Sequence, residues 1–328
     1  MNDRAVALLE QYEMEVRATR KGRGAILCDT DRGPLIFKEY AGNEAKLNTE
    51  NRLLTQIRET GSVRVDVLIP TKEGALFVQD NDGVKYVLKT FYEGRECNIY
   101  DKAECLEAVR LLARIHDSME LPVEEGESGI PVFSPLKEYE KHNRELVKVR
   151  SFLRKKGQKQ PFEIRLAGVL DEFLDQARQV TEAWSSYEEA LLKKEKSQAQ
   201  TYCHGDYQYH NIVRGESGWC VINFEKCIRD SQIRDLYLLL RKLLEKSNWQ
   251  VSLGRELLVA YQELRPISAY AYIDLYYRLA YPEKFWKIAN FYYNSGKAWI
   301  PEKNREKLER LIGQEREKMH FLETVFQI

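Results

Sequence analysis

The stretch CHGDYQYHN, residues 203–211, decides the fold of this chain of 328 residues. It is predicted to form a loop that leads into a hairpin, and it holds Asp206 and Asn211 five residues apart, so that both can face a common point. Phosphoryl transfer to a hydroxyl needs one carboxylate that accepts the hydroxyl proton and one oxygen ligand for a metal ion. The second strand of the hairpin brings the segment INFE, residues 222–225, to the same region. These residue types in this order point to phosphoryl-transfer chemistry.

A second group of candidate residues lies upstream, in a region predicted to form a sheet. Gly22 and Gly24 occupy a turn between two predicted strands, where glycine lets backbone N–H groups approach phosphates closely. Lys38 on the strand after that turn can neutralise phosphate charge, and Glu50 on the following helix can orient the lysine. Two alternatives stand beside this interpretation. A lysine in a strand is often a solvated edge charge, and Glu44 on the same helix competes with Glu50 as its partner.

The residue pattern predicts an α+β protein with two lobes. Residues 1–91 are predicted to form an antiparallel sheet of five or six strands, with one helix from about residue 43 to residue 60 that Gly61 closes. Residues 92–328 are predicted to form a large helical lobe that carries the loop and one embedded hairpin. Its helices are predicted at 103–118, 136–156, 162–193, 233–246, 253–264, 269–294 and 301–326.

Composition argues against several classes of protein. Lys and Arg number 51 and so do Asp and Glu, and this zero net charge argues against binding of nucleic acid by bulk electrostatics. No apolar run reaches the roughly 18 residues of a membrane span. The first 15 residues carry acids where a signal peptide would be apolar, so we expect synthesis in the cytoplasm. The six cysteines form no Cys-x-x-Cys pair and are expected to be small buried residues.

The order and spacing of these features resemble the aminoglycoside phosphotransferase and choline kinase branch of the protein-kinase-like fold. The motif His-Gly-Asp-x-x-x-x-Asn, here residues 204–211, is the catalytic loop of that branch. The resemblance implies a bilobal protein-kinase-like fold, with Asp206 as the catalytic base, Asn211 as a metal ligand, and ATP and Mg²⁺ as cofactors. It also implies a structural role for Asp235, an aspartate at a helix start that braces the loop. We expect His204 to bond backbone groups inside the loop rather than to shuttle protons.

Three further segments resemble the CotS family of bacterial spore coat proteins. They are KTFYEGREC at 89–97, VINF at 221–224 and YPEKFWK at 281–287. The resemblance runs from about Tyr12 to Phe326. It implies assembly into the spore coat, with other coat proteins as partners.

One position departs from the pattern of active kinases. The branch places a metal-binding aspartate in the sequence Ile-Asp-Trp or Ile-Asp-Phe, and this chain has Asn223 there. An amide oxygen is neutral, and hard divalent ions rely on carboxylate charge, so metal affinity should fall; Glu225 is a candidate replacement. Whether the chain is an enzyme is left open. One hypothesis is a coat component with a structural or interaction role and weakened or absent phosphotransfer, and the other is an active ATP-dependent phosphotransferase acting on a coat protein or a hydroxylated small molecule.

The segment 137–165 carries ten basic and four acidic residues, a local charge of +6. A solvated helix and turn is the ordinary interpretation of such a run. The functional interpretation is a docking surface for an acidic coat partner or a phosphorylated ligand. Nucleic-acid binding through this segment is disfavoured, because the net charge is zero and no recognition motif accompanies it.

Overall fold

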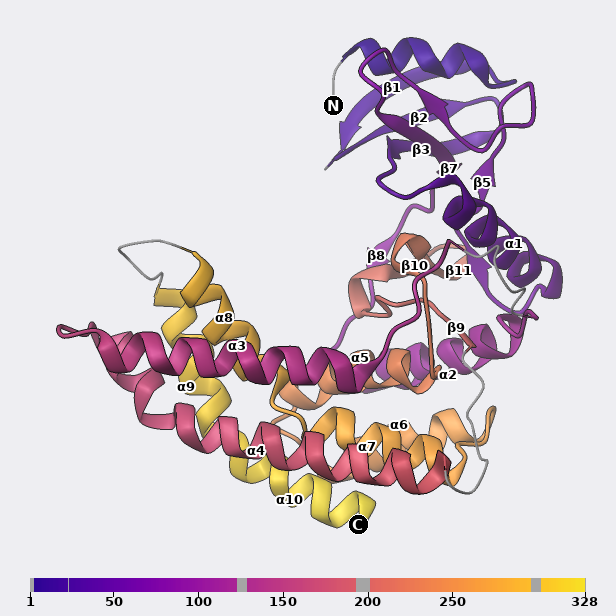
Figure 1. Cartoon of the computed structure of the whole chain (residues 1–328). Coiled ribbons are helices and arrows are strands. Elements are labelled where there is room, and N and C mark those ends of the chain that lie inside the picture. The colour runs from indigo at the N-terminus through magenta and orange to yellow at the C-terminus, as the bar shows by residue number, and fades with distance from the viewer. Residues whose placement is uncertain (1–2, 23, 123–128, 193–200, 296–301, 328) are drawn as a thin grey trace. The chain divides into compact units, whose positions relative to one another are not determined.

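The computed structural model divides into two compact units, and each is described by itself (Figure 1). The described residues are 3–22, 24–122, 129–192, 201–295 and 302–327. Unit 1 consists of Met1–Val132, Gln200–Leu239 and Ala260–Arg265, and unit 2 of Phe133–Ala199, Leu240–Val259 and Pro266–Ile328. Residue 91 is not a border of either unit, so the lobe boundary predicted there stays a prediction.

Unit 1 contains a six-stranded antiparallel sheet. Its order is β1 (Val16–Gly22), β2 (Ala25–Thr30), β3 (Gly33–Glu39), β7 (Lys85–Thr90) and β5 (Leu68–Ile69), with β6 (Val78–Gln79) also paired to β7. Alternate residues bury one face against a 3-10 helix, η1 (Asp3–Gln11), that the sequence did not predict. Phe37 and Tyr86 stack in this core with ring centroids 5.3 Å apart.

Two smaller sheets in unit 1 contain the strands on either side of the loop 203–211. One has the order β4 (Arg64–Val65), β11 (Gly218–Val221), β10 (Ile212–Gly215) and β8 (Arg95–Glu96), and the other pairs β12 (Ile228–Asp230) with β9 (Thr201–Cys203). The segment 64–69 contributes to two sheets, because β4 joins β11 while β5 joins β7. The predicted hairpin is present as β10 and β11, flanked by the 3-10 turns η2 (Tyr209–Asn211) and η3 (Phe224–Lys226).

Helix α1 (Glu44–Thr60) has the ends that the sequence predicts. The Asn43 side chain accepts a hydrogen bond from the Lys46 N–H, and Gly61 adopts the left-handed conformation at φ 64°. Its buried face includes Glu50, which is only 1% exposed. Helix α2 (Lys102–Ser118) also lies in unit 1, whereas α5 (Ile233–Lys246) and α6 (Val251–Gln262) each contribute to both units.

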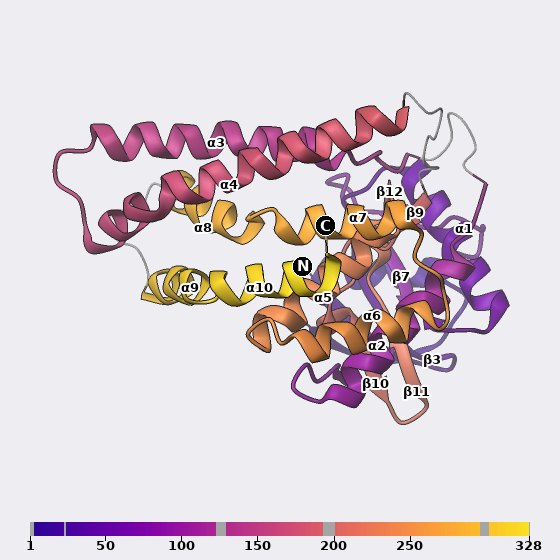
Figure 2. The same ribbon diagram turned by 90° about the horizontal axis from the view of Figure 1, so that it is seen from below.

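Unit 2 is helical, with α3 and α4 running side by side (Figure 2). Its remaining helices include α7 to α10, and the bounds are α3 (Pro135–Lys155), α4 (Pro161–Leu192), α7 (Ala269–Ala280), α8 (Glu283–Asn294), α9 (Glu302–Gly313) and α10 (Glu315–Phe326). The single helix predicted at 269–294 is wrong, since Pro282 has no N–H to donate and the chain restarts there as α8. The helix predicted at 301–326 is likewise two helices, with Gln314 between them.

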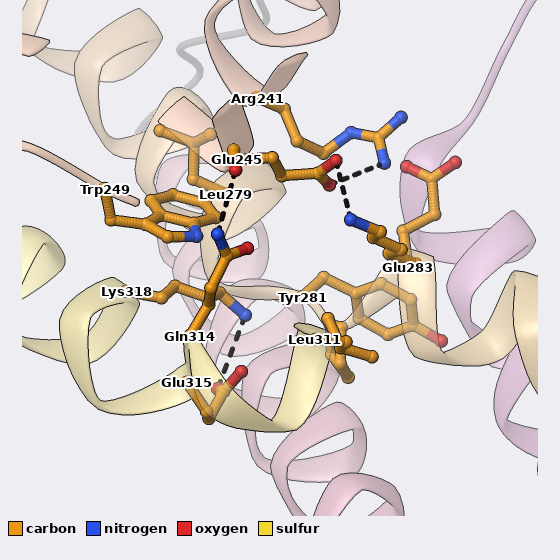
Figure 3. Close-up of a pocket in the computed structure, with 12 residues that line it drawn as sticks. Arg241, Glu245, Trp249, Leu279, Tyr281, Glu283, Leu311, Gln314, Glu315 and Lys318 are labelled. Carbon is orange, nitrogen blue, oxygen red and sulfur yellow. Dashed lines mark hydrogen bonds and ion pairs between the residues drawn. The ribbon is translucent and has the colours of Figure 1, made fainter. Parts of the chain in front are cut away.

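Polar side chains join the helices of unit 2 around a small pocket of about 20 Å³ (Figure 3). Glu245 binds Arg241 at 3.5 Å and Lys284 at 2.9 Å, and its carbonyl accepts from Gln314 at 2.9 Å. This volume holds about one water molecule, so the cluster is a helix contact rather than a ligand site. Among the helices that the structure describes, none has the length and apolar content to cross a membrane.

Candidate functional site

Asp235, in the first turn of α5, holds the loop after β9. One carboxylate oxygen accepts from the His204 N–H at 2.7 Å and the other from the Gly205 N–H at 2.9 Å. Burial raises the pKa of Asp235, but His116, with its Nε2 at 3.4 Å, and the loop N–H groups outweigh burial and lower it. Gly205 has φ 80°, and a Cβ there would lie 1.9 Å from the Lys226 carbonyl oxygen, so only glycine fits.

The His204 ring is a structural link within unit 1. Its Nδ1 accepts from the Asp206 N–H at 3.2 Å, and its Nε2 lies 3.0 Å from the Ile222 carbonyl, which assigns the proton to Nε2. The ring is fully buried. Both nitrogens are therefore occupied, and the ring ties the loop to the end of β11.

The loop presents Asp206 with access to solvent. Its carboxylate accepts from Lys226 Nζ at 2.8 Å and from Gln208 Nε2 at 2.6 Å, and the side chain is 15% exposed. The Asn211 amide donates to the Asp206 carbonyl at 2.8 Å, which closes the turn between the two residues. The loop can therefore present a carboxylate and an amide oxygen together, while the role of Asp206 as a base stays a prediction.

Asn223 lies at the centre of a chain of hydrogen bonds. Its Oδ1 accepts from Lys38 Nζ at 2.9 Å, and its Nδ2 donates to Asn211 Oδ1 at 2.9 Å. Its backbone N–H lies 3.2 Å from both carboxylate oxygens of Asp66. The backbone is left-handed, with φ 69°, a conformation that asparagine tolerates better than most residues. The structure thus brings together three of the predicted residues: Lys38, Asn211 and Asn223.

The predicted pairing of Glu50 with Lys38 is wrong. Glu50 Oε1 accepts from Lys89 Nζ at 3.1 Å, and Lys38 instead pairs with Glu225 Oε1 at 2.5 Å. Strand register explains the exchange. Lys38 lies opposite Val87 and Ile36 lies opposite Lys89, so the two lysines are diagonal neighbours on one face of the sheet. A carboxylate at that face can therefore form an ion pair with either lysine.

Lys89 is the main site residue that the sequence reasoning missed. Its ammonium is fully buried and lies 3.1 Å from Glu50, 3.0 Å from Asp66 and 3.2 Å from Glu225. Burial opposes the charged form of Lys89, but the three carboxylates outweigh it and raise the pKa of the ammonium well above its usual value. The sequence offered one sign of this burial: Lys89 lies two residues after Val87 on the same strand, and alternate residues of a strand share a face, which is buried at Val87. We call Lys38, Glu50, Asp66, Lys89 and Glu225 the lysine–carboxylate cluster.

The carboxylates of this cluster differ in pKa. Burial raises the pKa of Glu50 and of Asp66, and the attraction of Lys89 only partly offsets it. Burial acts on Glu225 in the same direction, but there Lys89 and Lys38 together prevail and lower the pKa well below its ordinary range. Glu225 is therefore the firmly charged carboxylate, and its Oε1 is shared between two ammonium groups.

The residues around Asn223 do not fit a tightly held Mg²⁺ ion. The oxygen donors at hand are the two amides of Asn211 and Asn223 and the carboxylates of Glu225 and Asp66, and Lys89 Nζ binds both carboxylates. The amides carry no charge, and Lys38 already binds both Asn223 Oδ1 and Glu225 Oε1. Over the described residues, no group of three or more His, Cys, Asp or Glu side chains is arranged to hold a metal ion.

A pocket of about 450 Å³ lies along β1, β2 and β3 in unit 1. Its lining includes the apolar side chains of Leu27 and Phe91. Leu27 lies opposite Ile36 in the register, whereas Lys38 lies opposite Ala25 and does not line this pocket. Gly24, in the turn that follows β1, has φ 71°. The nucleotide roles of Gly22, Gly24, Lys38 and Glu50 stay predictions.

Three comparisons relate this chain to known proteins. Residues 186–325 match the family described as "Spore coat putative kinase YutH". Spore coat protein S of Bacillus subtilis (strain 168) is 23% identical over an alignment of 325 positions that covers 94% of this chain and 89% of that protein. An aminoglycoside phosphotransferase from Alicyclobacillus acidocaldarius has a similar structure, with a TM-score of 0.84, 19% identity and coverage of 100% of this chain and 96% of the other.

A spectinomycin phosphotransferase in complex with ADP and spectinomycin also has a similar structure, with a TM-score of 0.62, 15% identity and coverage of 96% and 94% of the two chains. These matches confirm the resemblance to CotS-type spore coat proteins and to aminoglycoside phosphotransferases. The fold prediction is confirmed as well: the chain has the protein-kinase-like fold, with an antiparallel sheet in its N-terminal part and a mostly helical C-terminal part.

Proposed function

We propose that this chain is a spore coat component whose protein-kinase-like fold serves mainly in structure and interaction, with Mg²⁺-dependent phosphotransfer weakened or absent. It is made in the cytoplasm and joins other coat proteins. The similarity to spore coat protein S over 94% of the chain supports the coat assignment. The hydrogen bond between Lys38 Nζ and Asn223 Oδ1, at 2.9 Å, carries the functional part of the proposal.

That contact places a neutral amide beside Lys38, at a position where a site for a metal and phosphates would carry a negative charge. A carboxylate at position 223 would attract both Mg²⁺ and Lys38, whereas the amide of Asn223 attracts a metal ion only weakly. Lys38 is bound to Glu225, and Glu50 is bound to Lys89. A nucleotide phosphate would have to compete with Glu225 for Lys38, without a firmly bound metal ion to offset its charge. Nucleotide affinity should therefore be low and should depend little on Mg²⁺.

The alternative function is ATP-dependent phosphotransfer to a coat protein or to a hydroxylated small molecule. One observation favours it: the Asp235 carboxylate holds the loop, and Asp206 keeps a partly exposed carboxylate beside Asn211. Such a loop has the parts that accept a hydroxyl proton. In that case Mg²⁺ and ATP would be cofactors, with Glu225 released from its lysines to take the place of the missing aspartate.

A thermal-shift titration distinguishes the two functions. The full chain is melted with ATP, without metal and then with Mg²⁺ or Mn²⁺, beside a Lys38→Met variant. Ligand binding stabilises the folded state by about 2.7 kcal/mol at a hundredfold excess over the dissociation constant. We expect a small shift that the metals do not enlarge and that Lys38→Met removes. A large shift that requires the metal would contradict the proposal and support the phosphotransferase.

The coat assignment is tested separately. A fluorescent fusion of the chain, expressed in sporulating cells, should localise to the forespore surface and remain with the coat fraction after spore purification. A fusion that stays diffuse in the mother cell would contradict this part of the proposal and leave the nucleotide result unaffected.

A further inference from the structure

The basic segment 137–165 forms most of α3, the turn after it and the start of α4, in unit 2. A pocket of about 260 Å³ lies there. Its floor includes Leu153 and Leu170, which are both buried. Its walls carry the cationic side chains of Arg150, Arg154 and Lys159. The pocket therefore combines an apolar base with a cationic rim.

Only one carboxylate, Asp171, lines this pocket. Asp171 accepts from Arg150 at 3.3 Å and from Arg154 at 3.0 Å, so two guanidinium groups share it. Each guanidinium carries five N–H donors, and one side-chain contact leaves most of them available. Lys159 Nζ donates to the Lys156 carbonyl at 2.7 Å and pairs with no carboxylate of the described residues. Three positive charges thus face one negative charge.

We propose that this pocket binds carboxylate side chains from an acidic segment of a partner protein. Arg150 and Arg154 offer the paired N–H donors that carboxylates accept in bidentate geometry. A pocket of this size takes one or two side chains, and its apolar floor suits the methylene groups of glutamate. Nucleic acid would need an extended cationic track instead.

An exposed apolar residue extends the surface beside the pocket. Ile164 is 60% exposed. It lies three residues before Ala167 and seven before Asp171 on α4, so the three share one face of the helix. An acidic segment with an apolar neighbour would cover Ile164 while its carboxylates entered the pocket. The assignment rests on unit 2 alone and is independent of nucleotide binding in unit 1.

The test measures binding of a fluorescently labelled octaglutamate peptide to the full chain by anisotropy at low salt. We expect the double variant Arg154→Ala/Lys159→Ala to weaken binding about tenfold or more, since two charge-assisted contacts are lost. The matched control Lys303→Ala/Lys307→Ala removes the same charge from exposed positions of α9, and it should weaken binding less than about twofold. Unchanged melting temperatures would show that both variants fold.

A third variant gives an effect of opposite sign. Asp171→Asn removes the competing carboxylate and frees Arg150 and Arg154, so it should tighten peptide binding by about threefold or more. Equal losses in the pocket and control variants would overturn the proposal, because the attraction would then be diffuse. Weaker binding by Asp171→Asn would also overturn it. Tighter binding of a duplex oligonucleotide, or displacement of the peptide by millimolar inorganic phosphate, would assign the pocket to a phosphate ligand instead.

Discussion

Two regions of unit 1 agree to different degrees with the phosphotransferase site that the sequence predicts. The loop 203–211 keeps its backbone anchored: Asp235 binds two of its N–H groups, and the His204 ring binds the Ile222 carbonyl. The lysine–carboxylate cluster has different pairings from those the kinase pattern predicts. Lys38 binds Asn223 and Glu225, and a second lysine, Lys89, takes Glu50.

This difference indicates that the backbone architecture of such a site and the ion pairs of its side chains can change independently. The loop depends on buried backbone hydrogen bonds, whose loss would leave unsatisfied donors and destabilise the fold. The cluster depends on ion pairs between side chains, which can exchange partners while the strands stay in register. This separation is the basis of our proposal that the kinase-like fold persists in this chain while its affinity for metal is low.

The largest effect is expected from Lys89→Met, which breaks the cluster. The variant keeps the volume but removes the common cation of the buried carboxylates Glu50 and Asp66 and of the partly exposed Glu225, which retains Lys38. Removing one partner of a buried ion pair costs about 3–5 kcal/mol of unfolding free energy. Urea unfolding at pH 7 measures the loss.

The pH dependence of this variant's stability distinguishes an effect of charge from an effect of packing. Burial already raises the pKa values of Glu50 and Asp66, and loss of Lys89 raises them further above their unfolded values, so the folded state binds more protons than the unfolded state. The stability of the variant should then increase as the pH falls from 7 towards about 4.5, and the deficit against the wild type should narrow. A deficit that stays constant with pH would show that packing, and not charge, is responsible.

A smaller effect is expected from Asp235→Ala, which breaks the loop anchor. Two buried N–H groups, of His204 and Gly205, lose their acceptor, at a cost of about 1–3 kcal/mol. The folded pKa of Asp235 is lowered, so its contribution is present above the unfolded value of about 3.9 and is lost as the pH falls through the folded pKa. Denaturation of the variant and the wild type at pH 7 and at pH 3 measures the stability loss and its dependence on pH. An equal melting temperature of variant and wild type at pH 7 would contradict the anchoring role.

The smallest effect is expected at the turn between β1 and β2. Gly24 has φ 71°, so Gly24→Ala should cost about 1 kcal/mol of unfolding free energy. Gly22→Ala is the matched control, because a Cβ there makes only ordinary contacts, with the closest atom at 3.5 Å. Equal losses for both variants would show that the turn conformation carries no special cost.

The sequence predicted the fold well because its signals are local. Asn43 and Gly61 mark the ends of α1, and the alternate residues Leu35 and Phe37 of β3 bury one face of the sheet. The loop residues His204 and Asp206 could be identified because their motif is contiguous. Pro282 could have predicted the end of α7, since proline restricts the residue before it.

The pairings in the lysine–carboxylate cluster could not be predicted in the same way. They join residues as far apart as Lys38 and Glu225, and they depend on strand register, which a motif does not contain. Asp66 follows the short strand β4, whose partner in the structure is β11 and not the main sheet. Only the pairing of the strands reveals that Lys89 and Lys38 are neighbours.

The most direct test of the central claim is a calorimetric titration of ATP into the wild type and into Asn223→Asp, with Mg²⁺ and then with a chelator. The substitution changes little volume and adds one carboxylate where a metal ion needs charge. We predict that Asn223→Asp binds Mg²⁺–ATP more tightly by about 1.5–3 kcal/mol, the size of a charge-assisted contact, and gains nothing when metal is absent. Tight Mg²⁺-dependent binding already in the wild type would contradict the account, because Glu225 or another group would then supply the missing ligand.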